Sequence, residues 1–351
     1  MNHNSSSNNL FKIENNLNFL LNKKNEIIKY NEIFNFFKIK NIKECYRINK
    51  MNSNSLIYLL SNKKNKYILR ISKKKESISL EQQCLIAKNL KKRKFINPIR
   101  NKENKFILSK KKLSFLFYKK INGNIYDGNP KYFLKIFKNA IIFFNDLKHN
   151  KTNKHKNIDI NKYNIKKIIK SCNDLLNESF INDLFKNKFI TLKTKKLILL
   201  ENMFLRQSLN LLENLKLKKN NIHLIHSDLN HSNIIIDNNK VKFIDLESIR
   251  FDYTKIAVGH LFFKIVRHAI FNKKISVINF KKKNLPKILN LLINNLKIYK
   301  SSAELYLFCI FKILSDIARI LRFYKIKKNS RLMYDLEKKI HNLFEVSIIL
   351  K

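Results

Sequence analysis

The sequence has few of the residues that mark turns and few acidic residues. Its 351 residues include 3 glycines, 3 prolines and no tryptophan, and 25 aspartates and glutamates stand against 73 lysines and arginines. Only about ten of the basic residues are arginines, so lysine carries most of the formal charge of +48. The abundant residue types (Lys, Asn, Ile, Phe, Tyr) have A/T-rich codons and the scarce ones have G/C-rich codons. We therefore interpret the lysine excess as mutational drift in an A/T-rich genome, in preference to a surface selected for polyanions.

Cysteine is scarce, and its spacing excludes two kinds of site. The four cysteines, Cys45, Cys84, Cys172 and Cys309, are far apart in the chain and form no CxxC pair. This spacing argues against disulfides and against a zinc site. We expect small buried thiols in a reducing compartment.

Long apolar runs and a signal peptide are also lacking. The longest apolar stretch, Leu305–Tyr324, is interrupted by four charged residues, which indicates an amphipathic helix and not a membrane span. Residues 1–9 are rich in Asn and Ser, without the basic and apolar regions of a signal peptide. We expect a cytoplasmic protein with no membrane span; its oligomeric state is left open.

The composition that remains is that of a folded protein. Hydrophobic residues make up 44% of the chain and aromatic residues 11%, which is enough for a substantial core and excludes wholesale disorder. The length indicates one large domain or two modest ones.

The N-terminal part of the chain has mixed periodicity. Residues 1–40 are expected to be a polar tail followed by helices. Residues 41–118 contain short β-rich runs, among them a hairpin formed by residues 56–60 and 66–71, and a helix near residues 79–90. Gly123 marks a hinge at residues 119–124. The fold class predicted is α+β, with a small β-rich lobe before the hinge.

Residues 125–351 are predicted to form a larger helical lobe, interrupted by one β-rich segment at residues 223–249. Helical periodicity is clearest in five stretches: 132–147, 197–217, 260–271, 288–299 and 305–324.

The β-rich segment carries the residues with chemical meaning. Two isoleucine- and valine-rich strands flank a turn at residues 237–240, whose Asp and Asn tolerate positive φ. If the turn is centred near Asn239, Asn233 and Asp245 face each other at the open end of the hairpin. Asp228 lies in the loop that leads into the first strand.

Two carboxylates and an amide oxygen that converge are typical ligands of a hard cation. Mg²⁺ takes a few protein oxygens and completes its coordination with water and phosphate oxygens. A loop carboxylate such as Asp228 can orient an attacking hydroxyl and accept its proton. The simpler alternative is that these residues only cap turns.

The pattern His226-x-Asp228-x4-Asn233, followed by Ile244-Asp245-x-Glu247, resembles the catalytic and metal-binding loops of the aminoglycoside phosphotransferase and choline kinase superfamily, which are protein-kinase-like enzymes. The resemblance implies a two-lobed kinase-like fold. It further implies that Asp228 is the catalytic base and that Asn233 and Asp245 hold Mg²⁺ against the phosphates of ATP. Glu247 is often retained in the superfamily, and its role is left open.

Other parts of the nucleotide site match the superfamily more loosely. Arg70, in the run Tyr67–Ile71, is similar to the basic residue that reaches the nucleotide phosphates, although a solvated strand-end charge is the alternative. Glu81 is favoured over Gln83 as its partner because, of the two, only Glu81 can form an ion pair with Arg70. Lys119 stands where the hinge usually has a glutamate.

The sequence also departs from the superfamily pattern. The phosphate-covering turn, expected near residues 50–55, has no glycine, and Ser227 and Ser232 replace glycines of the catalytic loop. Histidines outside the motif, such as His260 and His268, are expected to have packing or capping roles. The lysine runs are expected to be solvated, because no nucleic-acid-reading element accompanies them.

The function predicted is a small-molecule kinase that uses ATP and Mg²⁺ to phosphorylate a hydroxyl of a metabolite, such as choline, ethanolamine, thiamine, homoserine or an amino sugar. Two alternatives remain. A catalytically silent kinase-fold binding protein would account for the missing glycines, and a basic nucleic-acid-binding protein would account for the charge.

Overall fold

The chain divides into two compact units. The computed structural model describes residues 23–48, 56–73, 81, 84–86, 90, 98–110, 112–148, 163–217, 221–245, 248–326 and 333–350. Among these, unit 1 holds the residues up to 126 together with 232–249, and unit 2 holds the others. The expected phosphate-covering turn, Gln83 and Glu247 lie outside the described residues.

Unit 1 is built on a five-stranded antiparallel sheet. Its strands are β1 (Glu44–Ile48), β2 (Leu56–Ser61), β3 (Lys66–Lys73), β4 (Ile107–Lys110) and β5 (Leu113–Lys119), in the order β1-β2-β3-β5-β4. The predicted β2–β3 hairpin is confirmed. The Asn62 carboxamide oxygen closes its turn, because it accepts hydrogen bonds from the backbone N–H groups of Lys64 and Asn65.

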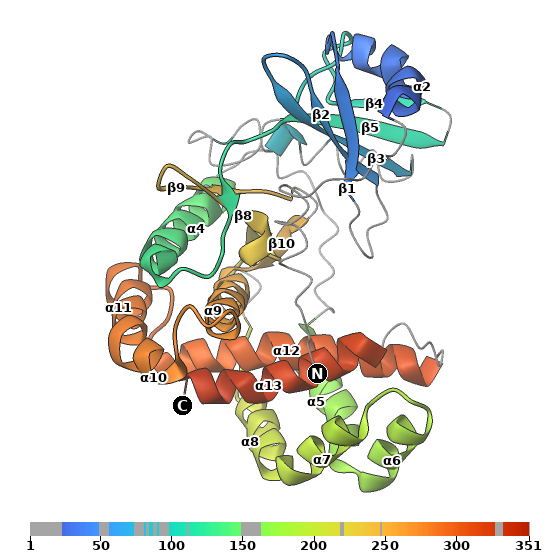
Figure 1. The fold of residues 1–351 in the computed structure, drawn as a ribbon. Coiled ribbons are helices and arrows are strands. Elements are labelled where there is room, and N and C mark those ends of the chain that lie inside the picture. The colour runs from blue at the N-terminus through green and yellow to red at the C-terminus, as the bar shows by residue number, and fades with distance from the viewer. Residues whose placement is uncertain are drawn as a thin grey trace. The chain divides into compact units, whose positions relative to one another are not determined.

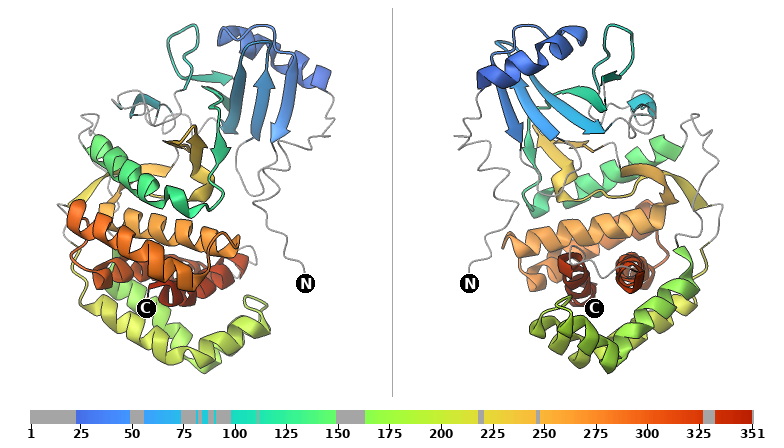
Figure 2. Two further views of the ribbon diagram at one scale, coloured as in Figure 1. Left: turned by 60° about the vertical axis from the view of Figure 1, so that its left-hand side comes forward. Right: turned by 90° about the vertical axis from the view of Figure 1, so that its right-hand side faces the viewer.

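Helix α2 (Lys23–Phe36) lies over one face of this sheet (Figure 2). Its Tyr30 and Phe34 pack in one core cluster with Leu69 and Ile71 of β3. Side chains alternate along a strand, so Arg70 projects from the opposite face. Arg70 is therefore on the face of β3 that does not pack against α2.

A second sheet in unit 1 contains the predicted hairpin. Strand β8 (Ile234–Asp237) pairs with β9 (Lys240–Phe243) on one side and with β6 (Asn124–Ile125) on the other. Asn238 and Asn239 have φ values of 44° and 64°, as the composition of the turn predicted. Gly123 has φ +118°, and a Cβ there would lie 2.5 Å from the Ile236 carbonyl oxygen, so glycine allows β6 to approach β8.

Unit 2 is mainly helical (Figure 1). Its helices are α4 (Phe133–Lys148), α5 (Ile165–Asn173), α6 (Glu178–Lys186), α7 (Leu192–Leu200), α8 (Asn202–Glu213), α9 (Thr254–Phe271), α10 (Val277–Asn279), α11 (Leu285–Leu289), α12 (Ser302–Ile326) and α13 (Met333–Leu350). Strands β7 (Ile222–His226) and β10 (Ile249–Tyr253) form a two-stranded sheet.

Helix α9 is the central helix of unit 2. Most of its side chains are buried, including Phe262, Phe263 and Val266, so it is apolar on nearly all sides. Helix α12 packs against both α9 and α13. The polar residues of α9 are therefore few and stand among apolar neighbours.

The helical half differs from the prediction at three places. The stretch predicted as one helix at residues 197–217 is two helices, because the chain bends at Glu201 (φ −98°, ψ 20°). The stretch at 288–299 is a short α-helix continued by a π-helical segment, Asn290–Asn295. Helices α5, α6 and α13 were not predicted individually. No described helix is both long enough and apolar enough to cross a membrane.

Candidate active site

In unit 1, the sheet face that carries Arg70 also carries the side chain of Tyr118. Arg70 pairs in register with Leu116, and Ile68 pairs with Tyr118, so Arg70 and Tyr118 lie on the same face. Burial raises the pKa of the Tyr118 phenol, and the charges of Arg70 and Asp245 both act on it. The structure thus brings Arg70 and Asp245 close to one phenol, although they are far apart in the sequence.

Glu81 lies in the same neighbourhood. Burial raises the pKa of the Cys84 thiol, Glu81 raises it further, and Arg70 opposes this. One carboxylate oxygen of Glu81 accepts a hydrogen bond from the backbone N–H of Phe106 at 3.2 Å. The carboxylate is therefore anchored beside the thiol on which Arg70 also acts, and its proposed ion pair with Arg70 remains a prediction.

The hairpin register corrects one expectation. The turn is centred between Asn238 and Asn239, so Asn233 lies opposite Ile244 and not opposite Asp245. The backbone N–H of Ile244 donates to the Asn233 carbonyl oxygen at 3.0 Å. Asp245 follows immediately with φ +76°, a left-handed conformation that is uncommon for aspartate. The two residues are still adjacent across the open end of the hairpin.

The chemistry of Asn233 and Asp245 suits Mg²⁺ bound with a nucleotide. They offer one amide oxygen and one carboxylate, both of them hard ligands. Among the described residues, no group of three or more His, Cys, Asp or Glu side chains is placed to hold a metal ion. This donor set is too small for a dedicated protein cage and fits a cation that completes its coordination with phosphate and water oxygens.

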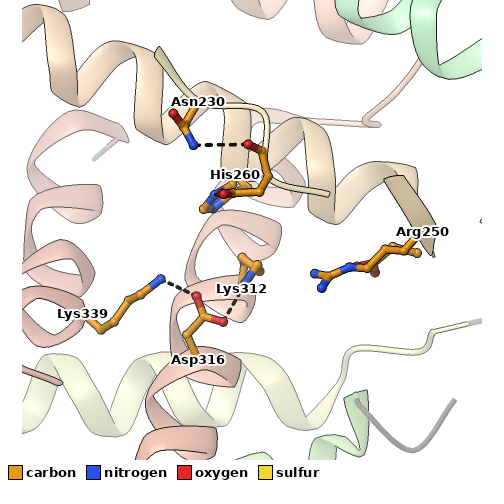
Figure 3. Close-up of polar contacts among 8 residues, drawn as sticks. Asn230, Arg250, His260, Lys312, Asp316 and Lys339 are labelled. Carbon is orange, nitrogen blue, oxygen red and sulfur yellow. Dashed lines mark hydrogen bonds and ion pairs between the residues drawn. The ribbon is translucent and has the colours of Figure 1, made fainter. Parts of the chain in front are cut away.

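Asp228, the predicted base, lies in unit 2 in the loop after β7. Its carboxylate Oδ1 is 3.1 Å from Nε2 of His260 on α9, and its carbonyl oxygen accepts a hydrogen bond from the Asn230 carboxamide at 3.2 Å (Figure 3). The Asp228 side chain is 54% exposed, whereas that of His260 is 6% exposed. A buried imidazole therefore holds a carboxylate that remains open to solvent.

The environment keeps Asp228 ionised. Partial burial raises its pKa, but the hydrogen bond with His260, together with nearby basic groups such as Lys264, lowers the pKa well below the usual range. Burial lowers the pKa of His260 to about 4, although Asp228 opposes this shift. At neutral pH, His260 is therefore uncharged and donates its Nε2–H to the carboxylate.

His260 is the site residue that sequence reasoning missed. It was expected to pack or to cap a helix, yet it contacts the carboxylate of Asp228, 32 residues earlier in the chain. Behind it, the buried Lys312 and the half-buried Lys339 both bind the Asp316 carboxylate (Figure 3). The charge of Lys312 also lowers the pKa of His260. One signal was available: His260 and His268 are eight residues apart and so share one face of a helix.

A pocket of about 440 Å³ lies elsewhere in unit 2, lined by residues that include His223, Tyr253, Lys255 and Glu304. None of the predicted site residues lines it. We therefore do not assign it to the reaction.

Neither a protein-family model nor a curated protein matches the sequence. Solved structures match its fold. Spectinomycin phosphotransferase, in complex with ADP and spectinomycin, has a TM-score of 0.61 at 13% identity, covering 91% of this chain and 98% of that chain. An aminoglycoside phosphotransferase from Alicyclobacillus acidocaldarius also has a TM-score of 0.61 at 13% identity, covering 89% of this chain and 91% of that chain.

A microcompartment-associated aminopropanol kinase has a TM-score of 0.55 at 10% identity, covering 93% of this chain and 99% of that chain. This chain has the fold of the small-molecule phosphotransferases. The α+β class and the structural likeness to aminoglycoside phosphotransferases that the sequence motif predicted are therefore confirmed. At such low identity the match establishes the fold, and the roles of individual residues rest on their own geometry.

Proposed function

We propose that this protein is a kinase that transfers the γ-phosphoryl group of Mg·ATP to a hydroxyl of a small molecule. The observation that carries the proposal is the Asp228 carboxylate, which is ionised, open to solvent and held by the buried His260 in the loop before the Asn233–Asp245 hairpin. The fold shared with small-molecule phosphotransferases supports the same reaction class.

In this reaction, Asp228 accepts a hydrogen bond from the hydroxyl of the acceptor and aims its oxygen at the γ-phosphorus. The bond between that phosphorus and the β–γ bridging oxygen breaks, the new P–O bond forms, and ADP leaves. A carboxylate with a lowered pKa is a weak base, so it takes the hydroxyl proton late and contributes mainly by orientation. This timing agrees with the loose transition state of phosphoryl transfer.

The nucleotide is assigned to residues of unit 1. Arg70 is proposed to neutralise phosphate charge, and Glu81 is proposed to restrain Arg70. Asn233 and Asp245 are proposed to hold Mg²⁺, which when bound would neutralise the charge on the β- and γ-phosphates. The left-handed backbone at Asp245 is consistent with a carboxylate fixed in one direction for this purpose.

The test is ADP release from Mg·ATP in the presence of a panel of small alcohols. Asp228→Asn is expected to lower turnover by a factor of about 100 or more while nucleotide binding is retained. Asp237→Asn, an aspartate of the hairpin that follows this loop and an ion-pair partner of Lys242, is the matched control and should keep full turnover.

Unchanged turnover in Asp228→Asn would refute the proposal that Asp228 orients the acceptor hydroxyl and accepts its proton. Nucleotide binding without turnover on any acceptor would instead indicate a kinase-fold binding protein. Salt-sensitive binding of nucleic acid that persists when both Asp228 and Asp245 are neutralised would favour a basic nucleic-acid-binding protein.

A further inference from the structure

One face of helix α9 carries a row of basic side chains that the proposed reaction does not use. His260, Lys264, Arg267 and His268 are spaced by four, three and one residues, so they lie along one side of the helix. His260 contacts Asp228, and the His268 ring stacks on His231 with ring centroids 3.7 Å apart and planes 9° apart.

These two contacts place Lys264 next to the loop that carries Asp228. They hold the loop from Asp228 to His231 along α9, with one contact a turn before Lys264 and the other a turn after it. The lysine therefore leaves the helix beside the loop that carries the proposed catalytic carboxylate. The row from His260 to His268 spans about 12 Å of helix, so it extends beyond the reacting carboxylate.

Helix α13 adds further positive charge to this side of α9. Arg267 forms an ion pair with Glu345, which ties the two helices together. Lys338 and Lys339 lie close enough to act on Lys264: burial first, and then the charges of Lys339, Lys338 and Arg267, lower the pKa of Lys264 to about 7, against the opposing effect of Asp228.

The acidic residues nearby are engaged by other cations. Glu345 binds Arg267, and Asp316 is shared by Lys312 and Lys339. Among the described residues, no carboxylate lies within ion-pair distance of Lys264, and its Nζ lies 5.9 Å from the centroid of the Phe263 ring. A half-buried lysine is thus placed beside the site, influenced by Asp228 but without an ion-pair partner among the described residues, where an anionic ligand would stabilise it.

We propose that the acceptor alcohol carries an acidic group, a carboxylate or a phosphate, which Lys264 binds with help from Lys338 while the hydroxyl of the same molecule lies at Asp228. This inference rests on the proposed function, because it takes Asp228 as the site of the acceptor. It narrows the substrate class: cationic acceptors, such as amino alcohols and amino sugars, would meet the positive side of α9 and be disfavoured.

The same cations also suit a different anion, the phosphoryl group in transit. We assign them to the acceptor because the row continues past Asp228 toward His268 and α13, whereas the residues proposed for the nucleotide belong to unit 1. The experiment distinguishes an acidic group of the acceptor from the transferred phosphoryl group, because Mg·AMP-PNP occupies the γ-phosphate position.

The first measurement is calorimetric binding of inorganic phosphate at constant ionic strength, with Mg·AMP-PNP present at saturation. Wild type should bind phosphate, and Lys264→Met should bind it about tenfold or more weakly, because a charge-assisted hydrogen bond is lost. Lys166→Met, an exposed lysine on α5, is the control for general charge and should match wild type.

Three results would overturn the proposal: no phosphate binding by wild type, equal binding by wild type and Lys264→Met, or binding that Mg·AMP-PNP abolishes. The last result would assign Lys264 to the transferred phosphoryl group.

The second measurement compares acceptors of similar carbon skeleton with and without an acidic terminal group, 3-hydroxypropanoate against 3-aminopropan-1-ol, with glycerol 3-phosphate against glycerol as a second pair. Acidic acceptors should give the faster ADP release, and Lys264→Met should raise their KM while leaving the KM for ATP unchanged.

Turnover only on the amino alcohol would keep the proposed kinase and refute the acidic acceptor. Phosphate binding that depends on Lys264, without turnover on any acceptor, would keep the anion site and refute the kinase.

Discussion

His260 is expected to act as a positioning residue for Asp228. Replacing it with leucine removes the Nε2 donor that lies 3.1 Å from the carboxylate but leaves an apolar side chain in a site that is already buried. The carboxylate would then rotate more freely and lose one restraint on the direction in which it presents its oxygen to a hydroxyl. The expected effect is therefore on kcat.

The size of the effect follows from the exposure of Asp228. A hydrogen bond to a charged group contributes about 1.5–3 kcal/mol. Because the Asp228 side chain is 54% exposed, water replaces part of that contribution, and we take about 1–2 kcal/mol. This range corresponds to a fall in kcat of about 5- to 30-fold.

The assay measures kcat and the KM for ATP in wild type, His260→Leu and His260→Gln. The glutamine carboxamide supplies an N–H donor, so it should recover part of the loss in kcat, and the KM for ATP should stay the same in both variants. Denaturant unfolding shows whether each variant is folded. A leucine variant with wild-type kcat, or a folded glutamine variant as slow as the leucine variant, would show that His260 only packs.

Three further predictions concern the metal, the hairpin and acid stability. Asp245→Asn should raise the Mg²⁺ concentration needed for half-maximal turnover, measured by titration at fixed ATP, whereas an unchanged requirement would remove Asp245 from the metal site. Gly123→Ala should lower the free energy of unfolding in urea by about 2–4 kcal/mol, because φ is +118° and the new Cβ would lie 2.5 Å from the Ile236 carbonyl oxygen; an unchanged midpoint would refute the close approach. The pKa of His260 is about 4 and that of His231 about 3, both lowered first by burial, so the folded state binds fewer protons than the unfolded state below about pH 6.5. Stability should therefore fall as pH drops from about 6.5 toward 4, and His260→Leu should flatten that slope.

The hairpin shows how far local sequence rules reach. Isoleucine-rich strands around consecutive asparagines were sufficient to predict both strands and the positive φ values of Asn238 and Asn239. The centre of the turn was misplaced by half a residue, because Asp237 and Lys240 pair in the ladder and leave a two-residue turn. The left-handed backbone of Asp245 had no sequence signal, since aspartate tolerates that conformation without requiring it.

Contacts between residues that are far apart in the chain could not be predicted from the sequence. His260 meets Asp228 because β7 and α9 pack together in unit 2, and periodicity gives only the face on which His260 lies. Similarly, the bend at Glu201 between α7 and α8 occurs without glycine or proline, so the composition of the stretch indicated one helix.

The meaning of the lysine excess depends on position and not on number. Codon drift places lysine wherever the fold tolerates it, and exposed positions tolerate it at little cost. Lys264 is different, because it is half-buried on α9, between Phe263 and Ile265 in the sequence and near three further cations. Desolvation and charge repulsion make a charged lysine unfavourable there, so codon drift alone does not explain it. An anion bound at Lys264 would offset this cost. The charge of +48 is therefore uninformative as a total, whereas the position of Lys264 within the fold supports the proposed acidic acceptor.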